Sequence, residues 1–181
     1  GASIAMAMDH LKTACAQLAT LSERRIFRMT HGKLSQELPS FLVKGTGLNS
    51  GFMIAQYTAA ALASEIKGLA HPASVDSIPT VQHHEDHVSM APISARMALQ
   101  SLECLADIIA IELLLGAQAL DLRFRVDGCS SPKILQKLHQ EIRQRVAFWE
   151  DDEVLHPAIS ELSRLVRDGE IENICPLEEL Y

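Results

Sequence analysis

The stretch EDHVSMAPISARMALQSLECLADIIAIELLLGAQALDLR, residues 85–123, decides the fold of this chain. It contains one proline, Pro92, and one glycine, Gly116, and its apolar residues recur with helical spacing. We therefore predict one very long helix over 85–123, bent near the proline. The apolar residues that carry the period are Met90, Ile93, Met97, Leu105, Ile108, Ile109 and Leu113.

The length of this helix has a consequence for assembly. At 1.5 Å per residue it is about 58 Å long. A globule of 181 residues has a radius of gyration of only roughly 16 Å. The helix must therefore project from the chain or lie in a bundle that other chains complete, and we predict self-association.

Shorter helical patterns lie on both sides of it. We expect further helices over 3–29, 52–69, 132–146 and 156–166, with Gly169 ending the last. Ser131 is expected to cap the fourth. In the first, one apolar stripe runs through Ile4, Met8, Leu11, Cys15 and Leu18, with Asp9 and Lys12 off the stripe. With no strand pattern and no repeat, the predicted class is all-α, a long-helix bundle segment over 1–127 and a small helical segment over 128–181.

Composition narrows the range of partners. The net charge is −7, from 16 basic and 23 acidic residues, which argues against a nucleic-acid surface because phosphate binding needs clustered positive charge. The most apolar window, residues 108–120, is interrupted by Glu112 and Gln118 and is too short to cross a membrane. The cysteines are widely spaced, without a Cys-x-x-Cys pair, which is typical of reduced thiols in a cytoplasmic protein. They are Cys15, Cys104, Cys129 and Cys175.

The densest polar cluster is the run HHEDH at 83–87. A zinc-protease helix requires a second histidine where this chain has Val88, so that motif fails. His83 and His87 are four apart and suit a metal, but no third ligand is evident, and we predict that no metal is bound. Two interpretations stay open: acidic residues at the positive end of the long helix, or Glu85 as a catalytic carboxylate facing a pocket.

A second candidate is the loop GTGLNSG at 45–51, which has three glycines before a helix. It has the look of a phosphate cradle but lacks the lysine and the following Ser or Thr of a P-loop. The alternative is that the glycines allow left-handed backbone and close packing.

Three longer strings, taken together with the acidic run, resemble a known family. They are LSERRI at 21–26, GLNSGFMIAQ at 47–56 and HPASVDSIPT at 71–80, and the last leads to EDHVSM at 85–90. In this order they resemble the C-terminal half of the histidine ammonia-lyases, within the superfamily of aromatic amino acid ammonia-lyases and aminomutases. The resemblance covers nearly the whole chain and is weaker beyond Gly128.

The resemblance implies an activity and an assembly. Members of the superfamily eliminate ammonia from an amino acid, L-histidine giving urocanate, with an electrophilic methylidene-imidazolone group made from an internal Ala-Ser-Gly. They are cytoplasmic homotetramers of long helices, and their active sites are shared between subunits. No Ala-Ser-Gly occurs in this chain. We therefore expect a C-terminal fragment, or one subunit of a split enzyme, that is inactive alone and whose prosthetic group forms in the N-terminal half.

The resemblance also points to individual residues. Glu85 matches the carboxylate near the substrate amino group and is the expected catalytic residue, while His84 and Met53 match positions that line the substrate pocket. For Met53, plain core packing is the alternative. Phenylalanine enzymes have glutamine in place of Glu85, which favours the histidine branch, but VQHH at 81–84 departs from the histidine pattern. The alternatives are a tyrosine ammonia-lyase or aminomutase fragment, or a non-catalytic helical oligomerisation subunit.

Overall fold

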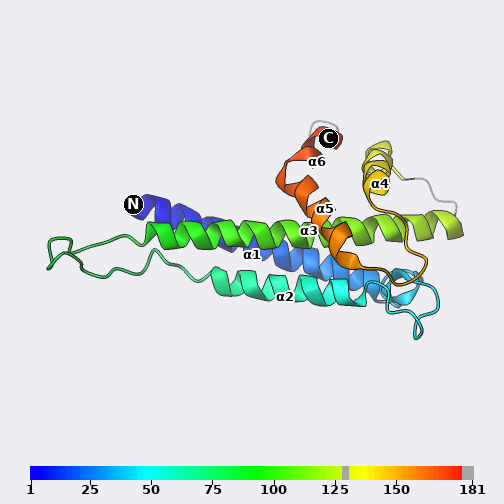
Figure 1. The fold of residues 1–181 in the computed structure, drawn as a ribbon, viewed down its shortest axis with the longest axis horizontal. Helices are drawn as coiled ribbons and strands as arrows, with labels where there is room; N and C mark the ends of the chain where they lie inside the picture. Colours follow the sequence, from blue (N-terminus) through cyan, green and yellow to red (C-terminus); the bar gives the residue numbers. More distant parts are fainter. Residues whose placement is uncertain (128–130, 177–181) are drawn as a thin grey trace. The chain divides into compact units, whose positions relative to one another are not determined.

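The computed structural model describes residues 1–127 and 131–176, and this part of the chain is helical without β-strands (Figure 1). The predicted all-α class is confirmed. The elements are α1 (Ala2–Thr30), the 3-10 helix η1 (Ser40–Leu42), α2 (Met53–Leu69), α3 (Ala91–Asp127), α4 (Lys133–Arg145), α5 (Leu155–Arg167) and α6 (Glu170–Ile174).

The long helix is α3, with 37 residues, but it begins at Ala91 and not at Glu85. Pro92 therefore lies in the first turn, where backbone N–H groups have no partner within the helix and a proline costs no hydrogen bond. The prediction of a helix running through Pro92 was wrong for this reason. The proline marks the start of the helix, and residues 85–90 are non-helical.

The described residues form two compact units, and each of the helices α1, α2 and α3 contributes residues to both. The first unit combines Gly1–Leu21 with Ala61–Leu105, and the second combines Ser22–Ala60 with the described residues from Ala106 onward. The division at residue 128 is of another kind, between the long helices and the short ones, and it stays a prediction.

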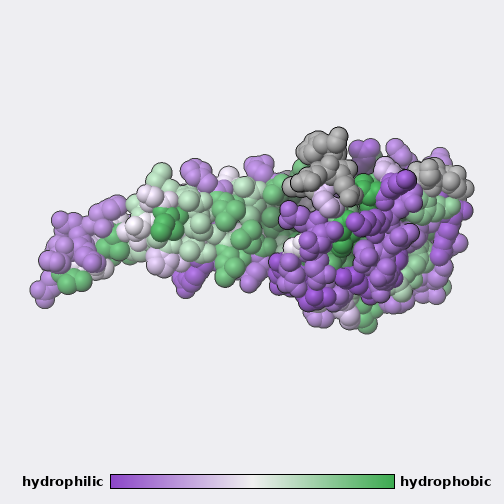
Figure 2. All heavy atoms as spheres, turned by 90° about the horizontal axis from the view of Figure 1, so that it is seen from above, coloured by the Kyte–Doolittle hydropathy of each residue, from purple (hydrophilic) through white to green (hydrophobic). Residues whose placement is uncertain are grey.

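In the first unit, the buried face of α1 is not the expected one. Ile4 and Leu18 of the predicted stripe are 59% and 54% exposed, so that prediction was wrong for these residues. The α1 residues buried in this unit are Ala5, Asp9, Lys12, Cys15 and Ala19. Hydrophobic periodicity ranks faces by apolar content, whereas here small residues and a mutually neutralising charge pair form the packed face. Figure 2 shows hydrophobic side chains left on the outer surface of the described chain.

The second unit has a conventional apolar core. Phe52 and Trp149 stack with ring centroids 4.9 Å apart, and Leu162 and Leu165 bury the apolar face of α5. Gly169 ends α5 in left-handed conformation, at φ 72°, as predicted. The predicted Ser131 cap was wrong: Pro132 occupies the N-cap position of α4, without a side-chain cap hydrogen bond. Among the described residues, no helix is both long and apolar enough to cross a membrane.

Candidate functional site

His84 and Glu85 lie on the non-helical arm between α2 and α3, in the first unit. The arm turns back on itself at Thr80 and Glu85, whose backbones exchange hydrogen bonds of 3.2 and 3.4 Å. Val81, Gln82 and His83 inside this turn have φ of 52°, 53° and 67°. Few non-glycine residues adopt left-handed backbone, so three in succession make a tight, specific turn.

The Glu85 carboxylate is exposed on this turn. It accepts a hydrogen bond of 3.1 Å from the Thr80 hydroxyl, and the neighbouring His84 N–H donates to the Val81 carbonyl at 3.0 Å. Because α3 begins only at Ala91, Glu85 is not in the first turn of a helix. The interpretation of Glu85 as a charge on the helix dipole was therefore wrong. The interpretation of Glu85 as a functional carboxylate stays a prediction, and the side chain is exposed, as that role requires.

The histidines around Glu85 do not assemble a metal centre in the described part of the chain, where no group of three His, Cys, Asp or Glu side chains is placed to hold an ion. His83, His84 and His87 are all exposed. The arm thus presents the Glu85 carboxylate beside exposed imidazole side chains.

Met53 belongs to the second unit, where it is half-buried and is the first residue of α2. The glycines of the loop before it have the left-handed backbone that the sequence suggested, with φ of 70° at Gly45, 111° at Gly47 and 53° at Gly51. At Gly51 a Cβ atom would lie 2.5 Å from the Phe41 carbonyl oxygen. The backbone at Gly51, just before α2, is therefore packed closely against Phe41 and Val43, whereas a Cβ atom at Gly45 or Gly47 would meet nothing within 4 Å.

The possible phosphate cradle at this loop is filled by the chain itself. The N–H groups of Ser50 and Gly51 donate to the Asp152 carboxylate at 2.9 and 2.6 Å, and Asn49 Nδ2 donates to Asp151 at 3.0 Å. An internal carboxylate thus occupies the anion-binding groups just ahead of α2. Sequence reasoning missed Asp152, because nothing local connects it to a loop about a hundred residues earlier.

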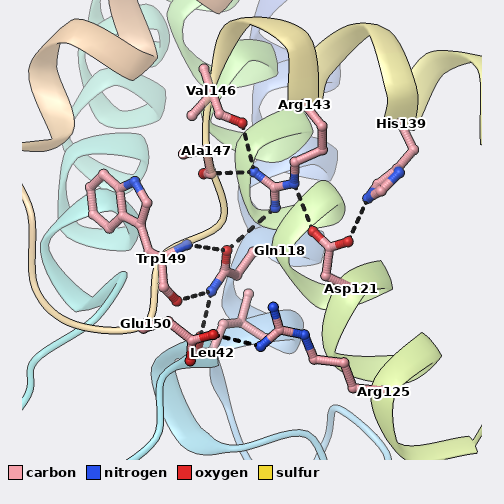
Figure 3. A network of polar contacts seen from close by, with 10 residues as sticks. All are labelled: Leu42, Gln118, Asp121, Arg125, His139, Arg143, Val146, Ala147, Trp149 and Glu150. Carbon is pink, nitrogen blue, oxygen red and sulfur yellow. Dashed lines mark hydrogen bonds and ion pairs between the residues drawn. The ribbon is translucent and has the colours of Figure 1, made fainter.

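A buried polar network holds the segment that carries Asp152 (Figure 3). Gln118, from the C-terminal half of α3, donates to the carbonyls of Leu42 and Trp149 at 3.2 and 2.8 Å and accepts from the Trp149 N–H at 3.2 Å. From the sequence, Gln118 was only an interruption of an apolar window. The structure makes it the side chain that joins α3 to η1 and to the segment after α4.

Asp121 and Arg143 extend this network to α4. Arg143 Nε donates to Asp121 at 2.6 Å, and the same guanidinium donates to the carbonyls of Val146 and Ala147 at 3.1 and 2.9 Å. His139 Nε2 lies 3.0 Å from Asp121 (Figure 3). The end of α4 and the segment after it are therefore tied to α3 by charge-assisted hydrogen bonds, which are stronger than neutral ones.

Two of the strings behind the family resemblance touch each other in the second unit. Glu23, from LSERRI, accepts a 3.0 Å hydrogen bond from Gln56, from GLNSGFMIAQ. Glu23 is buried and also pairs with Arg24 at 2.6 Å. Three residues before Gln56 is Met53, so this contact joins α1 to the first turn of α2.

The second unit also contains a cavity of about 640 Å³ between α1, α3 and α4, lined mostly by apolar side chains. Its polar neighbours include Arg28, Glu112 and His139. Met53 does not border it. Sequence reasoning missed the cavity, since its walls come from α1 with the segment 34–38, from α3 and from α4, which lie far apart in the chain.

The fold and the site together define an all-α protein of long helices with an exposed arm that carries acidic residues. The chain belongs to the aromatic amino acid lyase family, because the sequence model of that family matches residues 1–144. It is 47% identical to the histidine ammonia-lyase of Salmonella choleraesuis over 173 residues, which are 96% of this chain and 33% of that protein. The chain thus spans about a third of the length of the curated relatives it matches.

Two solved structures have the same fold as this chain over nearly its whole length. Histidine ammonia-lyase from Trypanosoma cruzi superposes with a TM-score of 0.89 at 43% identity, covering 97% of this chain and 34% of that one. Tyrosine aminomutase from Streptomyces globisporus superposes with a TM-score of 0.90 at 38% identity, covering 96% and 33%. The long-helix fold of the family is therefore the fold of this chain.

Proposed function

We propose that this chain is the C-terminal part of an ammonia-lyase that eliminates ammonia from L-histidine to give urocanate. The observation that carries the proposal is the 47% identity to an enzyme named histidine ammonia-lyase across 96% of the chain. The position and exposure of Glu85 are consistent with it.

In this proposal Glu85 is the catalytic residue. Elimination breaks the bond between Cα and the amino nitrogen, removes a proton from Cβ and forms a double bond between the two carbons. The carboxylate accepts hydrogen bonds from the substrate ammonium and takes part in proton transfer. In the part of the chain that the structure describes, the side-chain partner of this carboxylate is the Thr80 hydroxyl, so oxygen lone pairs stay available for substrate.

His84 and Met53 complete the proposed substrate-binding residues. His84 is next to Glu85 on the arm and is exposed, so its imidazole is available to a substrate. Met53 is half-buried at the start of α2, which suits an apolar wall of a pocket as well as it suits packing.

The methylidene-imidazolone group would supply the electrophile that makes the amino group a leaving group. This chain has no Ala-Ser-Gly from which the group could form. We therefore propose that the group comes from the remainder of the enzyme and that this chain alone is inactive. The enzyme is proposed to be a cytoplasmic homotetramer, in which the exposed apolar residues of α1 and α3 pack against neighbouring subunits.

The test uses the complete enzyme that contains this segment, with Glu85→Gln as the variant. Glutamine keeps the shape of the side chain and an oxygen for Thr80 but removes the charge and the proton-accepting power. We expect kcat with L-histidine to fall about 10²–10⁴-fold, as for loss of a positioned acid or base, with an unchanged melting temperature. The matched control is Asp86→Asn, the exposed neighbour on the same arm.

Nearly full turnover of Glu85→Gln would contradict the catalytic role. The same preparation, offered L-histidine, L-tyrosine and L-phenylalanine, identifies the substrate by the unsaturated acid or β-amino acid that forms. Conversion of L-tyrosine alone would replace the proposal by the tyrosine lyase or aminomutase alternative. No conversion of any of the three would favour a non-catalytic oligomerisation subunit.

A further inference from the structure

A buried ion pair lies at the base of the arm that carries Glu85. Lys12 and Asp9, one turn apart on α1, are 0% and 8% exposed, and Lys12 Nζ lies 2.7 Å from an Asp9 carboxylate oxygen. Taking two charges out of water is costly unless their remaining hydrogen-bonding capacity is also satisfied. The groups that satisfy it show what the pair does.

These groups come from both ends of the arm. Lys12 donates to the His71 carbonyl at 2.9 Å, and the Ser74 N–H donates to Asp9 at 2.8 Å, so the pair holds the chain as it leaves α2. Asp9 also accepts a hydrogen bond from the Ser94 hydroxyl, in the first turn of α3, where the chain returns. One carboxylate therefore joins the departing and the returning chain.

The charge state of Asp9 suits this role. Burial by itself would raise the pKa of the Asp9 carboxyl, but hydrogen bonds from Lys12, Ser74 and Ser94 outweigh burial and hold the pKa well below its usual range. Asp9 is therefore ionised at any pH at which an enzyme of this kind works, and its hydrogen bonds are charge-assisted.

Further along, the arm is held by weaker ties. The Val88 N–H donates to the Ser77 hydroxyl at 3.0 Å, and Thr80 and Glu85 pair beyond it. These hydrogen bonds are neutral, and they are either partly buried or exposed to solvent. Water therefore competes for them, and their net contribution to stability is small. The two sides of the arm are thus joined at three places along its length: at Asp9, between Ser77 and Val88, and between Thr80 and Glu85. Of these, the contacts at Asp9 are the ones that are both charged and buried.

We propose that Asp9 and Lys12 are positioning residues for Glu85: they clamp both ends of the arm and so set where its carboxylate meets the substrate. This inference rests on the proposed function. A displacement of about 1 Å at a reacting group lowers rates by as much as 10²-fold, so a clamp some distance from the chemistry matters for turnover.

The test uses the complete enzyme with Asp9→Asn, Lys12→Met and Ser94→Ala. Ser94→Ala is the mild variant, because it removes one hydroxyl and leaves the ion pair in place. Lys67→Met, the same substitution at an exposed lysine of α2 in the same unit, is the control. All are assayed well below their melting temperatures, with hydrogen exchange of residues 75–88 followed in parallel.

For the clamp variants we expect kcat with L-histidine to fall about 10- to 100-fold and exchange in residues 75–88 to become faster. Lys67→Met should change neither. Unchanged exchange on the arm in Asp9→Asn and Ser94→Ala would overturn the proposal, whatever the activity.

The second measurement repeats the clamp substitutions in a Glu85→Gln background. If the clamp acts through Glu85, they lower kcat little further there, whereas a general loss of structure lowers it by the same factor again, which would overturn the proposal. Full turnover of Glu85→Gln by itself would instead sink the proposed role of Glu85. Exchange on the arm would then still decide whether Asp9 and Lys12 hold it.

Discussion

Gly51 is a single residue on which the geometry before α2 depends. Its φ is +53°, and a Cβ atom would lie 2.5 Å from the Phe41 carbonyl oxygen and 2.6 Å from Val43 Cγ1. Left-handed backbone costs a non-glycine residue about 1–2 kcal/mol, and backbone cannot move aside as the end of a flexible side chain can. Conformation and space both require glycine here.

We therefore predict that Gly51→Ala lowers the unfolding free energy by about 2–4 kcal/mol, from left-handed strain and overlap together. Gly45→Ala is the control, because Gly45 has φ +70° but no atom within 4 Å of its Cβ position. It should lose only the strain of about 1–2 kcal/mol. Urea unfolding followed by circular dichroism measures both, and equal losses would contradict the close contact at Gly51.

Asp9 predicts a pH dependence of stability. Its pKa in the folded chain lies below the ordinary value of 3.8, so the folded state binds a proton less readily than the unfolded state. The stability it contributes is therefore complete above its ordinary pKa and is lost as the pH falls below that value.

We expect the melting temperature of the wild-type chain to exceed that of Asp9→Asn at neutral pH, and the difference to shrink as the pH falls below about 4. Melting temperatures of both proteins between pH 7 and pH 2 provide the measurement. A difference that stays constant over this range would show that the Asp9 charge is not what stabilises the fold.

At the scale of elements, α3 is the helix that organises the second unit. Gln118 lies in its C-terminal half, is 1% exposed and hydrogen-bonds backbone groups of Leu42 and Trp149. Loss of its amide leaves those buried groups without these partners, at about 1–3 kcal/mol for each group left unsatisfied.

Gln118→Leu, similar in volume, should therefore lower the unfolding free energy by about 3 kcal/mol or more, because three backbone groups each lose a partner at a cost of about 1 kcal/mol or more. Gln100→Leu is the control on the same helix, since the Gln100 side chain is exposed and, among the described residues, hydrogen-bonds to the Glu65 side chain. It should change stability by less than about 0.5 kcal/mol. Chemical unfolding distinguishes them, and a mild effect of Gln118→Leu would mean that water replaces the amide.

At the scale of the whole molecule, the described chain leaves large apolar side chains on its surface. Ile4, Met6, Leu18 and Leu21 of α1 are each more than half exposed. Large exposed apolar side chains mark surfaces on which other protein packs. The chain spans about a third of its relatives' length, and in a solution of the purified chain the protein available to pack on this surface is another copy.

We predict that the purified chain self-associates and that Leu18→Glu shifts it toward the monomer without loss of helix content. Gln17→Glu adds the same charge at the neighbouring exposed position and should leave the assembly unchanged. Light scattering with circular dichroism tests both variants. A stable wild-type monomer at micromolar concentration would refute the prediction.

Local patterns were enough for much of the fold. Helical period predicted the all-α class and the long helix, and the conformational freedom of glycine predicted the left-handed residues before α2 and the end of α5 at Gly169. The strings around Met53 and Glu85 predicted the family. Helical period, glycine conformation and short motifs depend on a few neighbouring residues, so one sequence is sufficient to read them.

Tertiary structure decided which partners the polar residues have. Asp9 and Lys12 belong to the buried face of α1 because Ser94 and His71, 85 and 59 residues away, satisfy them. Asp152 reaches the Ser50 N–H across 102 residues. A buried charge is stable only where such partners meet it, and the partners are brought there by the packing of helices. For this reason the hydrophobic stripe misplaced part of the buried face of α1.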